Sequence, residues 1–100
     1  MKILLMCNAG MSTGILQMKL EEEARKHQVE ANVEAIPMGE LNENIDSADI
    51  ILLGPQIRFA YQDVVKQAQG KPVLLIDVQD FGMMRADKIF QNVLEACKEA

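Results

Sequence analysis

The residues best suited to chemistry are one cysteine and the six residues that follow it. Cys7 ends an apolar run that begins at Ile3, and the following segment, 8–13, contains a glycine and several polar residues. A thiolate is a strong nucleophile, and the N–H groups of such a turn and of a following helix stabilise an anion. We therefore predict that Cys7 is a catalytic nucleophile that takes up a phosphoryl group. The residues expected to bind this group are Asn8, Ala9, Gly10, Met11, Ser12 and Thr13.

The spacing of this segment resembles the Cys-x5-Arg loop of thiol-dependent phosphatases, with Thr13 in the place of the arginine. In those enzymes the arginine clamps the phosphoryl group and stabilises the charge of the transition state. Without that clamp, we expect a phosphate on Cys7 to survive until it is passed on, as in a relay. The alternative is a low-molecular-weight thiol phosphatase or an arsenate-reductase-like enzyme. A Cys7 that only packs in the core is a further possibility.

A non-enzymatic module, such as a flavin-binding or receiver-like domain, is a third hypothesis. A receiver would need an acidic cluster after the first strand and an aspartate at the third. The sequence has neither, because Met6, Cys7 and Asn8 stand at the first place and Leu53 and Gly54 at the second. A flavin site would usually add aromatic stacking, and aromatic residues make up only 4% of the chain.

The apolar pattern predicts four strands that alternate with helices. Residues 2–7 and 49–53 are almost continuously apolar, as in buried strands, whereas residues 29–36 alternate, as in an edge strand. The fourth strand is expected at residues 72–76. Helices are expected at residues 13–27, 40–45 and 59–69 and, after a loop at 77–85, in a final segment with Asp87 as the N-cap.

This order predicts a single α/β domain over residues 1–100, with a four-stranded parallel sheet between two layers of helices. The buried and edge patterns favour the strand order 2-1-3-4, a flavodoxin-like winding. Ligands of such sheets bind beyond the carboxyl ends of the strands, where the order reverses. The segments 8–13 and 54–58 meet there. Possible partner-binding or supporting residues near this point are Gln56, Arg58 and Asp77.

Composition narrows the classes of function. The net charge of −5 argues against a general nucleic-acid binder, and no stretch reaches the roughly 20 apolar residues of a membrane span. We therefore expect a cytoplasmic protein whose Cys7 and Cys97 are free thiols. These two cysteines and the single histidine, His27, lack metal-ligand spacing, so neither a metal nor a cofactor is expected.

The segment 6–13 looks like the phosphorylation loop of the IIB components of the sugar phosphotransferase system, lactose/cellobiose/chitobiose type. Three later segments agree with this resemblance, which extends over the whole chain: 48–57, 71–73, and 76–77 together with 81–82. Members of the family often have a tyrosine before the glycine of the last segment, where this chain has Phe81.

The resemblance implies a relay with two protein partners. A phosphohistidine on a cytoplasmic IIA protein would donate to Cys7. The phosphocysteine would then donate to a β-disaccharide-type sugar, such as cellobiose, chitobiose or lactose, as a membrane IIC protein imports it. The resemblance thus implies a protein-cysteine phosphosugar phosphotransferase that acts transiently at the inner face of the membrane.

Overall fold

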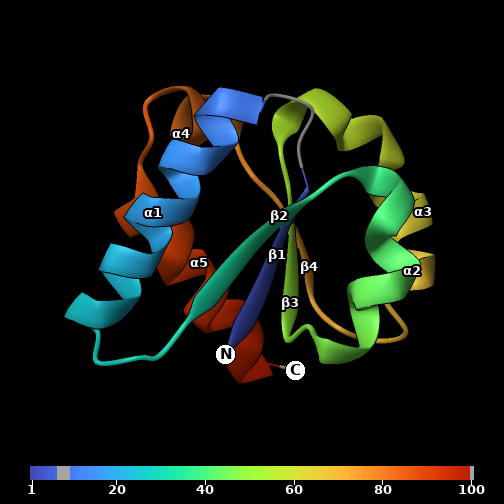
Figure 1. The fold of residues 1–100 in the computed structure, drawn as a ribbon, viewed down its shortest axis with the longest axis horizontal. Helices are drawn as coiled ribbons and strands as arrows, with labels where there is room; N and C mark the ends of the chain where they lie inside the picture. The colour runs from blue at the N-terminus through green and yellow to red at the C-terminus, as the bar shows by residue number, and fades with distance from the viewer. Residues whose placement is uncertain (7–9, 100) are drawn as a thin grey trace.

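The computed structural model describes residues 1–6 and 10–99, which form a parallel sheet between two layers of helices (Figure 1). The four strands are β1 (Lys2–Met6), β2 (Asn32–Ile36), β3 (Ile50–Leu53) and β4 (Val73–Leu75). They lie in the order β2-β1-β3-β4, and all three strand pairs are parallel. The predicted fold class and strand order are therefore confirmed.

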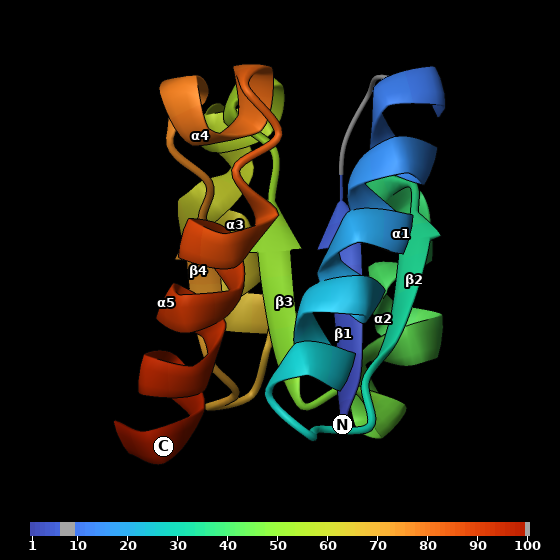
Figure 2. The ribbon, with the colours of Figure 1, turned by 90° about the vertical axis from the view of Figure 1, so that its left-hand side faces the viewer.

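The helices cover the two faces of the sheet unequally. α1 (Gly10–Lys26) and α5 (Ala86–Glu99), the two long helices, pack side by side on one face (Figures 1 and 2). Shorter elements cover the other face, and α4 (Val78–Gly82) lies at the carboxyl end of the sheet. The shorter elements are η1 (Met38–Glu40), α2 (Leu41–Asn44), η2 (Ile45–Ser47), η3 (Pro55–Ala60) and α3 (Tyr61–Gln67).

The central strands are buried on both faces because they separate two apolar clusters. Ile3 and Leu5 of β1 point into the cluster under α1 and α5, whereas Leu4 and Met6 point into the cluster under α2 and α3. All four side chains are at most 1% exposed. Alternate residues of a strand face opposite sides, so a continuous apolar run is what a strand in this position requires.

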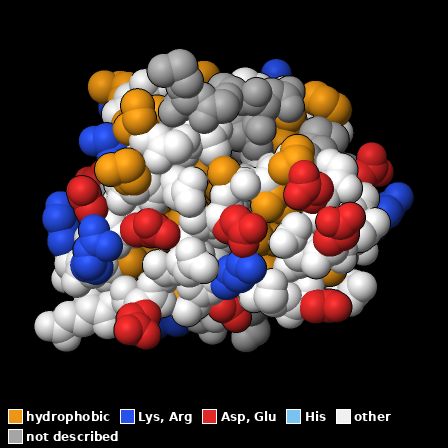
Figure 3. Space-filling view, in the orientation of Figure 1, with side chains coloured by type: hydrophobic (Ala, Val, Ile, Leu, Met, Phe, Trp, Pro, Cys, Tyr) orange, Lys and Arg blue, Asp and Glu red, His pale blue; other side chains and the backbone are white. Residues whose placement is uncertain are grey.

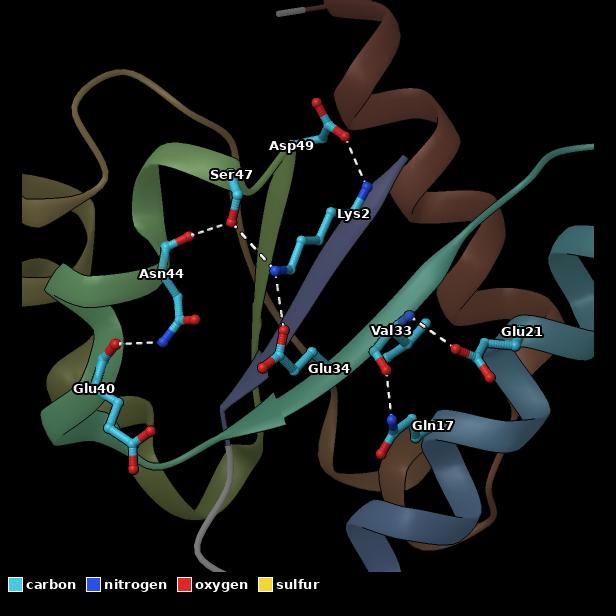
Figure 4. Close-up of polar contacts among 9 residues, drawn as sticks. All are labelled: Lys2, Gln17, Glu21, Val33, Glu34, Glu40, Asn44, Ser47 and Asp49. Carbon is cyan, nitrogen blue, oxygen red and sulfur yellow. Dashed lines mark hydrogen bonds and ion pairs between the residues drawn. The ribbon is translucent and has the colours of Figure 1, made fainter.

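The edge strand β2 is covered by polar side chains of α1. Gln17 Nε2 donates to the carbonyl oxygen of Val33, and the N–H of Val33 donates to Glu21 Oε2 at 3.0 Å (Figure 4). Unpaired N–H and C=O groups on an edge strand can pair with another chain. These two contacts therefore stabilise β2 and protect the edge from association.

Replacing Glu21 by alanine is expected to destabilise the fold by about 1–2 kcal/mol, because the N–H of Val33 loses its acceptor. Urea unfolding would measure this loss, and the amide of Val33 should exchange its hydrogen faster. Glu22 is exposed on the same helix, so Glu22→Ala is a matched control that should change stability by less than about 0.5 kcal/mol. Equal effects of the two substitutions would contradict this account of the edge.

A second polar network joins the amino ends of the strands. Lys2 forms an ion pair with Glu34 of β2 at 3.0 Å, and its Nζ donates to Ser47 Oγ at 3.2 Å (Figure 4). The N–H of Lys2 donates to Asp49 Oδ2 at 2.7 Å. This network lies at the amino end of the sheet, so it supports the register of β1 from the end opposite to the predicted site.

Some helix boundaries differ from the sequence-based expectation. α1 begins at Gly10, not Thr13, because the first turn of a helix tolerates small and polar residues that are also typical of loops. Residues 55–58, expected as loop, belong to η3, which has Pro55 in its first turn. The expected loop at 77–85 contains α4, which Asp77 caps. Asp87 is not an N-cap but lies inside the first turn of α5.

α3 buries only part of its apolar residues. Tyr61 is 36% exposed and Val65 is 42% exposed. The buried residues, Ala60, Val64 and Ala68, follow one another at steps of four. A short helix on this face buries only one narrow stripe, so its neighbouring apolar positions remain at the surface.

Candidate functional site

Hydrogen bonds join the carboxyl ends of three strands, β1, β3 and β4, at the carboxyl end of the sheet. The N–H of Gly54 donates to the carbonyl oxygen of Met6 at 2.8 Å, which ties the end of β3 to the end of β1. The N–H of Ile76 donates to Leu53 at 2.9 Å, which ties the end of β4 to β3. The chain that leaves β1 therefore begins at a fixed point beside Gly54, at the reversal of strand order.

The first turn of α1 begins close to the end of β1. Only residues 7–9 separate Met6 from Gly10, and α1 starts at the same edge as α4 and η3 (Figure 2). Cys7, Asn8 and Ala9 lie outside the described residues.

The amino terminus of α1 can stabilise an anion. The N–H groups of the first four residues, 10–13, have no acceptor within a helix, and the helix dipole makes this end positive. The first turn contains no acidic residue that would occupy these donors. A phosphoryl group on a residue just before this turn would therefore be favourably placed.

The predicted phosphate-binding residues differ in what the structure describes of them. Gly10, Met11 and Ser12 belong to the helix, but their side chains lie outside the described part. Thr13 is only 4% exposed, in line with Leu16 and other buried residues of α1. The side chain of Thr13 therefore lies on the inner face of α1.

The three supporting residues are only partly brought together. Arg58 and Asp77 line one pocket of about 220 Å³, whereas Gln56 is exposed on η3 and does not line it. Asp77 Oδ1 accepts from the N–H of Gln79 at 2.8 Å and of Asp80 at 3.4 Å, so it caps α4. The remaining lining residues of the pocket are Pro55, Leu75, Ile76 and Val78.

Sequence reasoning missed a buried carboxylate in α4, at the carboxyl end of the sheet. Asp80 is 3% exposed, and its Oδ1 lies 3.6 Å from Arg85 Nη1 and 3.7 Å from Lys88 Nζ. The two cations compensate the charge of Asp80 and connect α4 to α5. The sequence signal was the capping residue Asp77, which places Asp80 in the first turn of a helix once that helix is recognised.

The second cysteine lies far from the candidate site. Cys97 borders a pocket with Met1, Asp49 and Pro72, at the amino ends of the strands. Burial raises the pKa of the Cys97 thiol, and the nearby carboxylate of Asp49 raises it further, while the amino terminus opposes both. Cys97 is therefore a poor nucleophile at neutral pH.

This shift predicts selective alkylation. In a Cys7→Ala variant, whose only thiol is Cys97, iodoacetamide at pH 7.5 should react more slowly with the folded than with the unfolded protein. The folded state holds the Cys97 proton more tightly, so this contribution to stability is present below the ordinary thiol pKa. It is lost as the pH rises through the raised value. Equal alkylation rates in both states would contradict the assignment.

The described residues contain no group of three or more histidine, cysteine or acidic residues that could hold a metal ion. None of the helices within 1–6 and 10–99 combines the length and the apolar character that crossing a membrane requires.

Comparison with known proteins assigns the family. Residues 2–92 match the family described as "PTS system, Lactose/Cellobiose specific IIB subunit". The chain belongs to this family. A IIB relative, the oligo-beta-mannoside-specific EIIB component of Bacillus subtilis (strain 168), is 35% identical over 93% of this chain and 92% of its own.

Two solved IIB structures resemble the fold. The solution structure of the cellobiose-specific IIB component of Borrelia burgdorferi matches with a TM-score of 0.81 and 36% identity, covering 99% of this chain and 93% of its own. The lactose-specific IIB domain of Streptococcus pneumoniae matches with a TM-score of 0.83 and 22% identity, over 96% of both chains. The second likeness shows the shared fold alone, and together they confirm the three-layer architecture of a IIB component.

Proposed function

We propose that this chain is the phosphoryl carrier of a sugar phosphotransferase system, with Cys7 as the residue that bears the phosphate. The observation that carries the proposal is that a member of the IIB family has a cysteine that only Asn8 and Ala9 separate from the start of a helix, whose first N–H groups have no helical acceptor. Those donors, from residues 10–13, would hold the phosphoryl oxygens together with the backbone of Asn8 and Ala9 and the hydroxyls of Ser12 and Thr13.

The proposed reaction consists of two in-line transfers. The Cys7 thiolate attacks the phosphorus of a phosphohistidine on a IIA protein, so that an S–P bond forms and the N–P bond breaks. A sugar hydroxyl then attacks the same phosphorus, an O–P bond forms, and the thiolate leaves. The proton of the hydroxyl passes to a base of the membrane IIC partner. Helix N–H groups stabilise the negative charge of the phosphoryl oxygens in both steps.

The proposed acceptor is a β-disaccharide-type sugar, such as cellobiose, chitobiose or lactose. The names of the relatives and of the family support this class, since they include oligo-beta-mannoside-specific, cellobiose-specific and lactose/cellobiose-specific components. The carrier would work in the cytoplasm and meet the IIC permease at the inner face of the membrane. Gln56 and Asp77 would support the site from the neighbouring strand ends.

The lifetime of the phosphocysteine tests this proposal. Incubation with a phosphoenolpyruvate-driven donor mixture at mildly alkaline pH should add one phosphate, detected by intact-mass spectrometry. The adduct should decay slowly without an acceptor and disappear when the IIC protein and its sugar are added. An adduct that releases free phosphate over many turnovers would instead identify a thiol phosphatase, and no adduct at all would contradict both functions.

A further inference from the structure

The pocket between η3 and α4 is not used by the proposed transfer chemistry. It has a volume of about 220 Å³ and lies where β3 and β4 end, at the same edge as the start of α1. Two of its apolar residues are exposed, Val78 at 60% and Leu75 at 44%. Phe59, which follows Arg58 in the chain, is 73% exposed. Apolar side chains exposed together in this way are typical of a protein contact.

The surface view agrees with this placement. Apolar side chains lie along the upper edge in Figure 3, on both sides of the atoms that are not described, and most carboxylates of this face lie lower. A protein that approaches this edge would therefore meet an apolar rim before it meets the acidic surface of the chain.

The pocket is lined by one cation, Arg58, and one carboxylate, Asp77, and Asp77 faces the start of α4. Arg58 is exposed, and within residues 1–6 and 10–99 it forms no ion pair. The other charged lining residue, Asp77, already accepts two backbone N–H groups at the start of α4. Arg58 therefore offers a free guanidinium in a chain whose net charge is −5.

We propose that Arg58 and the apolar pocket beside it form the docking site for the phosphorylated donor protein. The inference rests on the proposed function and adds which surface receives this partner. A donor that carries a phosphoryl dianion is repelled by an acidic chain, and a free arginine at the rim reduces that repulsion and orients the encounter. A neutral sugar gains nothing from such a charge, so the donor is the partner that fits. Leu75, Val78 and Phe59 supply the apolar contact, and the guanidinium supplies the charge.

The test compares two substitutions that change the net charge equally. Arg25 is exposed in the last turn of α1, at the helix end remote from the predicted site, so Arg25→Glu is the control for Arg58→Glu. The probe is a histidine-phosphorylated IIA protein chosen from a panel of lactose/cellobiose systems because it phosphorylates the wild-type chain. The rate of phosphate transfer to the chain is measured at low and at physiological salt.

Arg58→Glu is expected to lower the second-order transfer rate about tenfold at low salt, and less at higher salt, while Arg25→Glu lowers it less than about twofold. The spontaneous decay of the phosphocysteine should be the same in both variants. Equal rates for both variants, with normal wild-type transfer, would overturn the docking site and leave the proposed function intact. Failure of every IIA protein in the panel to phosphorylate the wild type would overturn the proposed function and the docking site with it.

Discussion

A Cys7→Ala variant is expected to take up no phosphate under conditions in which the wild-type chain is fully phosphorylated. The substitution removes the only thiol in the segment next to the start of α1, and no other nucleophile of comparable strength lies in residues 6–13. Cys7→Ser should also fail, or react many times more slowly, because a serine hydroxyl is far less ionised than a thiol at neutral pH. Intact-mass spectrometry of the three proteins would measure the difference.

Cys97→Ala is the matched control for this prediction, because it removes the other cysteine of the chain. Cys97 lies at the amino ends of the strands, and burial and Asp49 keep its thiol protonated. Phosphate uptake by Cys97→Ala should therefore equal that of the wild type. Far-ultraviolet circular dichroism should show that all the variants are folded. Normal uptake by Cys7→Ala would end the phosphocysteine hypothesis.

The sheet could be predicted from the sequence because its central and edge strands have different patterns. β1 and β3 are apolar at successive positions because helices cover both of their faces, as the two clusters around Ile3 and Leu4 show. The edge segment alternates, and the outward-facing N–H and C=O groups of its Val33 contact side chains of α1 instead of a further strand. The pattern of apolar residues in each strand therefore predicted the strand order. The strand order in turn predicted the point of reversal, at the carboxyl end of β1, where Cys7 follows in the sequence.

The helix starts were harder to predict because small and polar residues are typical both of turns and of the first turn of a helix. Gly10, Ser12 and Thr13 would suit a turn, but they also suit the first turn of a helix, where N–H groups need no helical acceptor. Asp77 is similarly ambiguous, since an aspartate after a strand can close a turn or cap a helix. In the structure α1 begins at Gly10, so these residues form the first turn of the helix.

The pocket beside Arg58 could not be predicted, because its lining comes from three separate segments. Pro55 and Arg58 follow β3, Leu75 ends β4, and Val78 belongs to α4. α4 was not predicted, so nothing in the sequence placed Val78 opposite Arg58. The compensation of Asp80 by Arg85 and Lys88 depends on the same helix and was missed for the same reason.

The second large effect is expected from Phe90→Ala in α5. Phe90 is fully buried in the cluster between the sheet and the two long helices, and its ring centroid lies 5.5 Å from that of His27, just beyond α1. Its removal should leave a cavity and destabilise the protein by about 3–5 kcal/mol. This is a large part of the roughly 5–15 kcal/mol that stabilises a domain of this kind. Because α1 and α5 pack together, the loss should also loosen the helix that begins at the candidate site.

Phe59→Ala is the matched control, because it makes the same chemical change at a side chain that is 73% exposed. Its free energy of unfolding should differ from the wild-type value by less than about 0.5 kcal/mol. Urea unfolding of both variants at several protein concentrations would measure the two costs and detect self-association. The same variant should still weaken docking of the phosphorylated donor, since Phe59 belongs to the proposed contact. Equal destabilisation by the two substitutions would mean that Phe59 is covered in the free protein, which contradicts both its exposure and its availability to a partner.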